Sequence, residues 1–458
     1  MTLAVQEQTG TGIARKGGVD AAALLTAYVC LLWFIPSPMV VSALGSAGSP
    51  ATLFGIGLFF YWAWHTVRRT ERSDRRFRPV RAAMMGLLVV MLMVYAHAMA
   101  GPLPGDEIST ADSGMLRLIS LAGVVLLACD GISDMDRLVT VLQRLALAAG
   151  LVALLGLAQY ATGELFVDRI RVPGLTAGTE GWTLSSRSGF SRPSGTSMSP
   201  IEYGVVLGMM LPLAIVCASV QSRYRWLSRA MLVAMIASIF FSMSRSAYLC
   251  SLAGMFVLAL SWDLRTRLRA LGVFAVVSAV MYVSVPGLLG SIRGLFSNAD
   301  EDPSIASRTG SYDIAGEFIT GSPIVGKGFG TFLPKYWILD NAYLGMTIEA
   351  GFLGLLALLT LIVAGLVSAR SARRALQSER DARPTAGTEA TDAVGAHHVQ
   401  FAQALLASVA AGAGGLAFFD AFAFPQTAGC FFLLIGLAGA MRRLTQTPAP
   451  DPRRSVRS

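Results

Sequence analysis

Long apolar stretches recur along almost the whole chain, and they limit its possible folds more than any other feature. A helix that crosses roughly 30 Å of hydrocarbon needs about 20 residues, and about twelve stretches approach this length. They comprise residues 21–41, 51–67, 82–100, 115–128, 138–160, 201–220, 230–241, 247–261, 270–289, 342–367, 401–419 and 427–441. The seventh and eighth are short, so this pair could instead form a re-entrant or tilted element. We therefore expect an all-α polytopic membrane protein with about twelve transmembrane helices.

The composition agrees with a membrane location. Hydrophobic residues make up 54% of the chain and charged residues only 14%, and the mean hydropathy is +0.58. Such a chain has too little polar surface to cover a soluble globule. We expect residues 21–441 to form a single transmembrane domain between two cytoplasmic tails, 1–20 and 442–458. The first apolar stretch leads directly into a second one, so it is expected to remain as a helix and not to be cleaved as a signal peptide.

The distribution of cations predicts the orientation of this domain, because Lys and Arg in short loops resist translocation. Most of the 37 Lys and Arg residues fall in one set of alternate connections, for example at 68–81, 223–229, 265–269 and 370–383. This pattern predicts that both termini and a polar linker at about 370–400 face the cytoplasm. The protein is then a multi-pass protein of the cytoplasmic (inner) membrane.

The charge pattern also excludes several classes of function. The net charge of +9 comes from cations dispersed among the cytoplasmic loops, whereas a nucleic-acid-binding protein gathers them on one face. The four histidines lie outside the long outer loops, and no Cys-x-x-Cys pair occurs, so a zinc site is not expected. The acidic run at 298–302 does not have the spacing of an EF-hand. We expect no nucleic-acid partner, no metal and no cofactor.

Two outer segments are long enough to hold a site, at about 161–200 and at about 290–340, and the larger one separates the ninth and tenth spans. Arg192 lies in the first, in a run of small residues and proline. Arg245 lies between two apolar stretches that leave almost no loop between them. A cation near bilayer depth costs several kcal/mol and is usually retained to meet an anion. An anionic, membrane-borne substrate is therefore the first hypothesis.

Carboxylates near the same outer ends are candidate general bases. Asp340 is expected at the outer mouth of the tenth span, with Glu349 about two and a half helical turns deeper. Glu202 lies just inside the sixth span. Partial desolvation at such a mouth raises the pKa of a carboxyl group, whereas nearby arginines lower it. The glycines around Lys327 lack the context of a nucleotide-binding loop and are expected to form a tight turn.

Several of these motifs together carry a family resemblance. They are the run from Arg192 to Thr196, the Ser244-Arg245-Ser246 turn, the Ser307-Arg308 pair before a Gly-Ser-Pro-Ile-Val-Gly run, and Asn341 followed by Gly351 and Gly354. In this order, and over about residues 138–361, they resemble the O-antigen ligase and O-antigen polymerase family. The twelve-span layout fits the same family.

The resemblance implies a metal-independent, GT-C-like glycosyltransferase that acts on undecaprenyl-pyrophosphate-linked sugars at the outer membrane face. In the ligase branch of the family, a histidine precedes the Asn, Ser or Gln that corresponds to Asn341. This chain has Asp340 in place of the histidine. The departure favours a polysaccharide polymerase or another polysaccharide-transferring relative over a ligase.

The chemistry of such a transfer assigns roles to the candidate residues. Negative charge builds on the departing pyrophosphate, which guanidinium groups outside bulk water stabilise strongly. We expect Arg192 and Arg245 to supply these groups and Asp340 to deprotonate the incoming hydroxyl, with inversion at the anomeric carbon. The candidate substrate-binding residues are Arg308, Glu202, Asn341, Glu349 and Lys327.

The predicted function is polymerisation or transfer of lipid-linked oligosaccharide units in cell-surface polysaccharide biosynthesis. The expected partners are the lipid-linked donor, a sugar acceptor and membrane lipids, with a flippase and a chain-length regulator as further candidates. Ligase-type transfer to a lipid or protein acceptor stays open. So do a transporter of a small anion or lipid-linked substrate, and a scaffold of a polysaccharide assembly complex without chemistry of its own.

Overall fold

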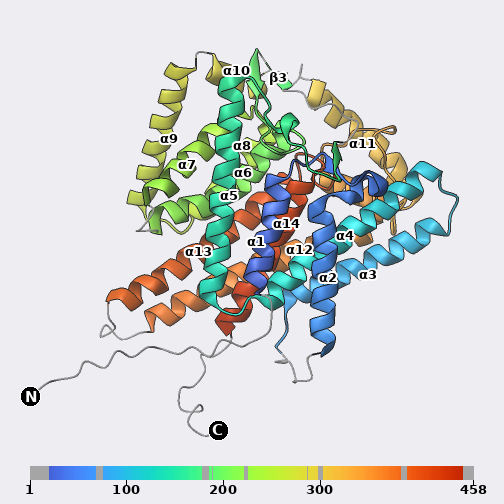
Figure 1. Ribbon diagram of the computed structural model, residues 1–458, viewed down its shortest axis with the longest axis horizontal. Helices are drawn as coiled ribbons and strands as arrows, with labels where there is room; N and C mark the ends of the chain where they lie inside the picture. Colours follow the sequence, from blue (N-terminus) through green and yellow to red (C-terminus); the bar gives the residue numbers. More distant parts are fainter. Residues whose placement is uncertain are drawn as a thin grey trace, which may run out of the picture.

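The protein is a bundle of long helices with short strands and two further helices gathered at one end (Figure 1). The structure, a computed structural model, describes residues 20–68, 76–177, 185–187, 189–220, 225–285, 287–297, 303–382 and 389–446. The predicted terminal tails, apart from Asp20 and 442–446, and the acidic run at 298–302 lie outside these residues.

The helices of the described chain follow the apolar stretches closely. They are α1 (Ala21–Phe34), α2 (Pro50–Arg68), α3 (Pro79–Met99), α4 (Gly105–Gly131), α5 (Met135–Thr162), α6 (Pro200–Val220), α7 (Arg225–Phe241), α8 (Arg245–Ala259), α9 (Leu264–Ser284), α10 (Leu288–Ser297), α11 (Pro303–Gly321), α12 (Ala342–Asp381), α13 (Glu389–Gly415) and α14 (Pro425–Gln446). Each of the predicted apolar stretches coincides with one of them. The helices α10 and α11 were not predicted and lie largely in the segment at 290–340 that was expected to be an outer loop.

Short elements complete the fold. They are the 3-10 helices η1 (Ser42–Gly48) and η2 (Val167–Arg169) and the strands β1 (Met39–Val40), β2 (Thr176–Ala177), β3 (Ser185–Arg187) and β4 (Phe190–Arg192). The β1 strand pairs with β2, and β3 pairs with β4, both in antiparallel register. The loop after α1 is thereby joined to the predicted outer segment at 161–200.

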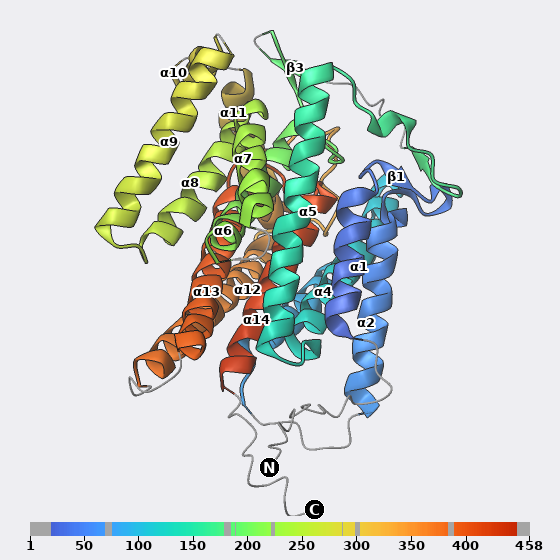
Figure 2. The same ribbon diagram turned by 60° about the vertical axis from the view of Figure 1, so that its left-hand side comes forward.

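Seven of the described helices are long and apolar enough to cross a membrane, and α1 and α8 are shorter apolar helices. The chain is therefore a multi-pass membrane protein with an all-helical membrane domain. Within the bundle, 83% of the apolar window of α6 and of α14 is buried by other helices, against 6% for α9. Thus α6 and α14 form the centre, and α9 stands at the edge of the bundle (Figure 2). Many of the apolar side chains of α9 are exposed.

The first helix begins and the last helix ends at the same end of the bundle (Figure 2). Arg137, at the start of α5, pairs with Asp20, whose side chain also caps α1. Arg443, near the end of α14, donates to the carbonyl of Ile132 just after α4. The strands, α10 and α11 lie at the opposite end. This arrangement matches an even number of crossings.

Helix boundaries differ from the prediction where local chemistry acts. The first helix ends at Phe34 because Ile35 precedes Pro36 and adopts an extended conformation. In contrast, α12 continues to Asp381, far into the stretch expected to be a polar linker. Ala, Arg, Ser, Gln and Glu residues follow its apolar part, and several of these are good helix formers.

A break inside α12 shapes the end of the bundle that carries the strands. Gly351 has φ 63° and ψ −171°, a conformation that is essentially restricted to glycine. The turn at 323–328 packs into this break, where the backbone N–H groups of Lys327 and Gly328 donate to the carbonyls of Ile348 and Glu349 (2.9 and 2.8 Å). The glycine-rich segment is therefore a tight turn, as predicted. It holds the following loop against α12.

We predict that Gly351→Ala destabilises the protein strongly. Its added Cβ would lie 2.2 Å from the carbonyl oxygen of Ile324, and its backbone would be strained by about 1–3 kcal/mol even without this clash. Gly57→Ala is the matched control, because its Cβ meets nothing within 4 Å. Thermal unfolding in detergent should show a much lower melting temperature for Gly351→Ala and an unchanged melting temperature for Gly57→Ala. Equal melting temperatures would contradict the described break.

Candidate functional site

A pocket of about 530 Å³ opens at the end of the bundle that carries the strands. Its walls come mainly from α1, the N-terminal half of α4, the loop before α12, the first turns of α12, and the 416–424 segment between α13 and α14. These parts are distant in the sequence, and they meet because α1, α6, α12 and α14 all begin or end here. A cavity of this size is in the range that binds small-molecule ligands.

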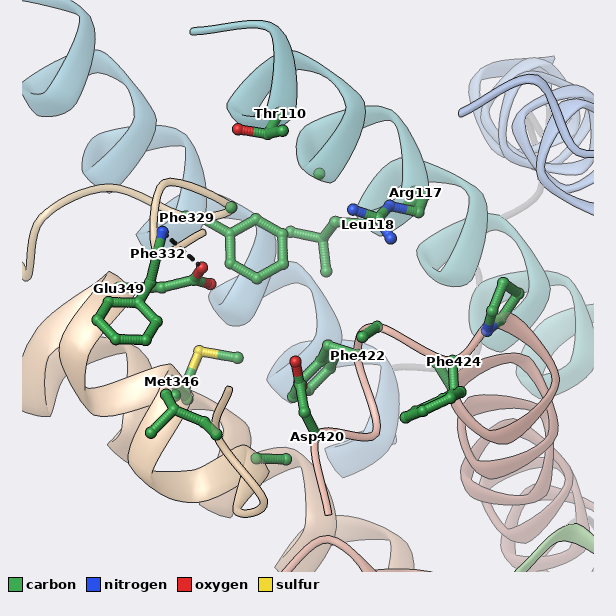
Figure 3. Close-up of a pocket in the computed structure, with 18 of the residues that line it drawn as sticks. Thr110, Arg117, Leu118, Phe329, Phe332, Met346, Glu349, Asp420, Phe422 and Phe424 are labelled. Atoms are coloured by element: carbon green, nitrogen blue, oxygen red, sulfur yellow. Dashed lines mark hydrogen bonds between the residues drawn. The ribbon is translucent and has the colours of Figure 1, made fainter. Parts of the chain in front are cut away.

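Charged side chains from three elements point into this pocket (Figure 3). Arg117 comes from α4, Glu349 from α12 and Asp420 from the 416–424 segment. Arg117 lies close enough to Glu349 and Asp420 for electrostatic attraction to both. Glu349 is further held by the backbone N–H of Phe332, which donates to its Oε1 (3.2 Å). Asp340 also lines the pocket and lies near Asp420.

Aromatic rings form much of the remaining wall. They are Tyr28, Phe329, Phe332, Trp337, Phe419, Phe422 and Phe424. Phe329 and Phe422 meet edge to face, with ring centroids 6.5 Å apart. The pocket thus combines flat apolar faces with a few convergent charges, which is the usual make-up of a site that orients a polar ligand.

Asp420 lies outside the helices, and its surroundings raise the pKa of its carboxyl group. Enclosure by protein raises its pKa to about 6, and nearby Asp340 acts in the same direction. Backbone N–H groups of Phe422 and Ala423 and the charge of Arg117 oppose this shift only in part. Asp420 is therefore held in an environment that disfavours its charge, as is frequent in functional sites.

Of the predicted catalytic residues, only Asp340 lines this pocket. The next residue, Asn341, caps α12 through its side chain, which accepts from the N–H groups of Tyr343 and Leu344. This cap fixes the start of the helix beside Asp340. Of the predicted substrate-binding residues, Asn341 therefore uses its side-chain oxygen to bind backbone N–H groups of α12. Glu349 faces the cavity.

Arg192 and Arg245 lie together at the junction of α7 and α8 and do not line the pocket. The Nε of Arg192 donates to the carbonyl of Ser242 (2.8 Å), and Ser244 caps the helix that begins with Arg245. Burial and the nearby charge of Arg187 lower the pKa of Arg192 to about 10, so it remains a cation at neutral pH. The arginines expected to bind pyrophosphate and the carboxylate expected to act as base therefore do not line the same described pocket.

The 416–424 segment connects this junction to the pocket. The hydroxyl of Ser246, the residue after Arg245, donates to the carbonyl of Phe418 (2.9 Å). Two residues further on, Asp420 faces the pocket, and the carbonyl of Leu416 accepts from the N–H of Ala342 at the start of α12 (2.9 Å). The 416–424 segment therefore lies between the two arginines and Asp340, and it contacts the residue next to Arg245 and the start of α12.

The remaining predicted residues have other surroundings. Glu202 is fully buried, and its carboxylate accepts from the backbone N–H groups of Met198 and Gln426 (2.8 and 2.7 Å), joining the start of α6 to that of α14. Lys327 forms an ion pair with Glu107 (2.9 Å). Arg308 belongs to α11, but its side chain lies outside the described residues.

Sequence reasoning missed Arg117 and Asp420. Arg117 lies within the predicted span at 115–128, and an ionisable residue inside an apolar span is itself a signal of function. Asp420 directly follows the predicted span at 401–419. Both signals were present in the sequence, but only the fold shows that the two residues share a pocket with Asp340.

The pKa of Asp420 makes a testable statement about stability. A carboxyl group with a raised pKa in the folded protein stabilises it at low pH, and this contribution is lost as the pH rises through about 6. As the pH rises from about 4 to about 7.5, the free energy of unfolding of Asp420→Asn should therefore increase by about 1–3 kcal/mol relative to that of the wild type. Melting temperatures in detergent across this range measure the difference. The exposed Asp168→Asn serves as the control, and a pH-independent difference for Asp420→Asn would contradict the assignment.

Part of the chain matches a known protein family. Residues 230–359 match a family model described as O-antigen ligase. The match runs from α7 into α12, so it includes Arg245, Asp340 and Glu349 but not Arg117 or Asp420. No curated protein matches the chain. This match confirms the resemblance to the O-antigen ligase family seen in the sequence, and the apolar helices on both sides of the matched stretch belong to a multi-pass membrane protein.

Proposed function

We propose that the protein is a glycosyltransferase that polymerises or transfers undecaprenyl-pyrophosphate-linked oligosaccharide units at the outer face of the cytoplasmic membrane. The observation that carries the proposal is the 530 Å³ pocket in which Asp340 shares the lining with Arg117 and Asp420. Asp340 belongs to the part of the chain that matches the O-antigen ligase model. Membrane-embedded transfer of a lipid-linked polysaccharide is the activity that this family suggests.

The pocket suits a sugar better than a lipid tail. Its aromatic faces can cover the apolar faces of a pyranose ring, and its carboxylates and Arg117 can exchange hydrogen bonds with hydroxyl groups. Arg117 also favours the ionised form of the carboxylates that it faces. We assign Asp340 as the general base, with Glu349 and Asp420 as the neighbouring carboxylates that orient the acceptor.

The two arginines at the α7–α8 junction fit the anionic part of the donor. In this proposal Arg192 and Arg245 bind the pyrophosphate, and Arg308 is a further candidate. The acceptor hydroxyl attacks the anomeric carbon, and its proton passes to the carboxylate of Asp340. The bond from that carbon to the phosphate oxygen breaks, and its electron pair leaves with the lipid pyrophosphate, inverting the anomeric carbon. Guanidinium groups stabilise the departing charge.

The proposed topology has about twelve spans in a GT-C-like arrangement. Both termini then face the cytoplasm, which agrees with the first and last helices meeting at one end. Arg76, Arg78, Arg442 and Arg443 lie at that same end. The pocket, at the other end, faces outward, where a flippase would deliver the lipid-linked donor and a chain-length regulator would act.

The aspartate at position 340 favours a polymerase. The ligase branch carries a histidine there, so the acceptor base differs between the two. Transfer to a lipid or protein acceptor by the same pocket is the second candidate, because the family match itself is to the O-antigen ligase model.

Purified protein incubated with lipid-linked repeat units should elongate them, and Asp340→Asn should lower the rate by about 100-fold or more, since general bases contribute this much. Gel separation and mass spectrometry of the glycan products measure the effect. The exposed Asp168→Asn is the matched control and should retain full activity. Undiminished elongation by Asp340→Asn would remove this residue from the mechanism. Uptake of labelled substrate into proteoliposomes without any glycosidic product would favour a transporter.

Arg192→Gln should weaken the binding of inorganic pyrophosphate, used as a mimic of the leaving group, by about tenfold or more, because hydrogen bonds to charged groups contribute about 1.5–3 kcal/mol. Competitive inhibition of the transfer reaction measures this affinity. The control is Arg169→Gln, whose exposed side chain pairs with Glu164 on an outer loop. Equal inhibition of the wild type and Arg192→Gln would place the pyrophosphate elsewhere.

A further inference from the structure

A second, smaller pocket lies at the opposite end of the bundle from the candidate active site. It holds about 150 Å³ and is formed where α3 begins and α4 and α14 end. Arginines dominate its lining, namely Arg76, Arg78, Arg442 and Arg443. None of the described residues that line it is acidic.

Part of this positive charge stabilises the fold. Arg78 and Arg81 both pair with Asp130 (2.7 and 3.2 Å), which also accepts from the Nε1 of Trp62 (3.0 Å). Arg443 donates to backbone carbonyls at the end of α4, including that of Cys129 (2.9 Å). The single carboxylate of Asp130 is thus shared by several donors, and the arginines around it outnumber it.

The donors that remain converge on the pocket from two directions. The Nε of Arg442 is buried and has no hydrogen-bond partner in the described part of the chain. A buried donor of this kind needs an acceptor. The first turn of α3 also borders the pocket, and Arg78, which precedes Pro79, makes no side-chain cap. A helix N-terminus attracts anions because its N–H groups and its dipole point toward them.

Close packing keeps these donors together. Gly439 of α14 lines the pocket, and a Cβ at this position would lie 2.8 Å from the Sγ of Cys129 and 3.0 Å from the Cβ of Val80. The glycine therefore lets α14 approach both α3 and α4. Arg442 follows less than one helical turn later, beside the start of α3.

The surroundings of the pocket indicate that an anion bound there would belong to a lipid. Phe77, which lines the pocket, is 72% exposed, and Trp64 near the end of α2 is 58% exposed with Arg68 stacked 3.9 Å over its ring. Exposed aromatic rings beside arginines are typical of the interface between hydrocarbon and head groups. Basic pockets between transmembrane helices on the cytoplasmic side bind anionic head groups.

We propose that this pocket binds the phosphate of an anionic phospholipid, with Arg442, Arg76 and the N-terminus of α3 as its donors. The acyl chains would lie against the exposed face beside Phe77. The site is distinct from the transferase pocket, and the proposal does not depend on the identity of the transferred sugar. Lipid bound here would join α3, α4 and α14 and so support the centre of the bundle.

The test measures lipid binding to delipidated protein by native mass spectrometry and by the lipid-dependent rise in melting temperature. Phosphatidylglycerol should bind and stabilise the wild type, whereas phosphatidylcholine and inorganic phosphate at equal concentration should do so much less. The double variant with Arg76→Gln and Arg442→Gln should bind phosphatidylglycerol about 25-fold more weakly, since each arginine near a head group adds about 1 kcal/mol.

Controls separate this site from general charge attraction. Arg374→Gln removes an exposed arginine of α12 outside the pocket and should leave the affinity unchanged. Arg76→Gln alone lies in the segment before α3, so it tests the site even if the double variant does not fold, and it should weaken binding about threefold to fivefold. Wild-type affinity in Arg76→Gln, an equal loss in Arg374→Gln, or equal stabilisation by inorganic phosphate would overturn the proposal.

Discussion

The break in α12 is the constraint on which the pocket end of this protein depends. A transmembrane helix that loses its internal hydrogen bonds must satisfy the freed carbonyls elsewhere. Here the turn at 323–328 supplies the donors, because Lys327 and Gly328 bind the carbonyls of Ile348 and Glu349. The fit is close, since neither Gly326 nor Gly351 has room for a Cβ against the facing backbone. The loop that follows is thereby anchored against α12.

This anchoring determines the composition of the candidate site. The loop after the turn contributes Phe329, Phe332 and finally Asp340 to the pocket, while the broken helix contributes Glu349. Two other elements complete the arrangement, with Arg117 from α4 and Asp420 from the 416–424 segment. In a partly enclosed space, one cation and several carboxylates strongly shift one another's pKa values. The site therefore follows from backbone packing as much as from the charged side chains themselves.

The sequence predicted the helices well and the site only in part. The length of the apolar stretches predicted the helices of the bundle because the lipid phase demands continuous apolar segments. Local signals also identified Asp340 and the tight turn around Lys327. Arg117 and Asp420 meet only because the fold brings α4 and the 416–424 segment to the same pocket, and no local pattern in the sequence encodes this. For the same reason, the sequence could not show that Arg192 and Arg245 lie at the α7–α8 junction, one segment away from Asp340.

In the proposed mechanism, the sugar of the donor occupies the pocket while its pyrophosphate lies at the α7–α8 junction. An electron cryo-microscopy structure of the protein in a lipid nanodisc, with a non-hydrolysable lipid-linked donor, tests this claim directly. We predict sugar density between Arg117, Asp340 and Asp420, and phosphate density beside Arg192 and Arg245. Donor density at any other position, with the pocket containing only solvent, would contradict the account.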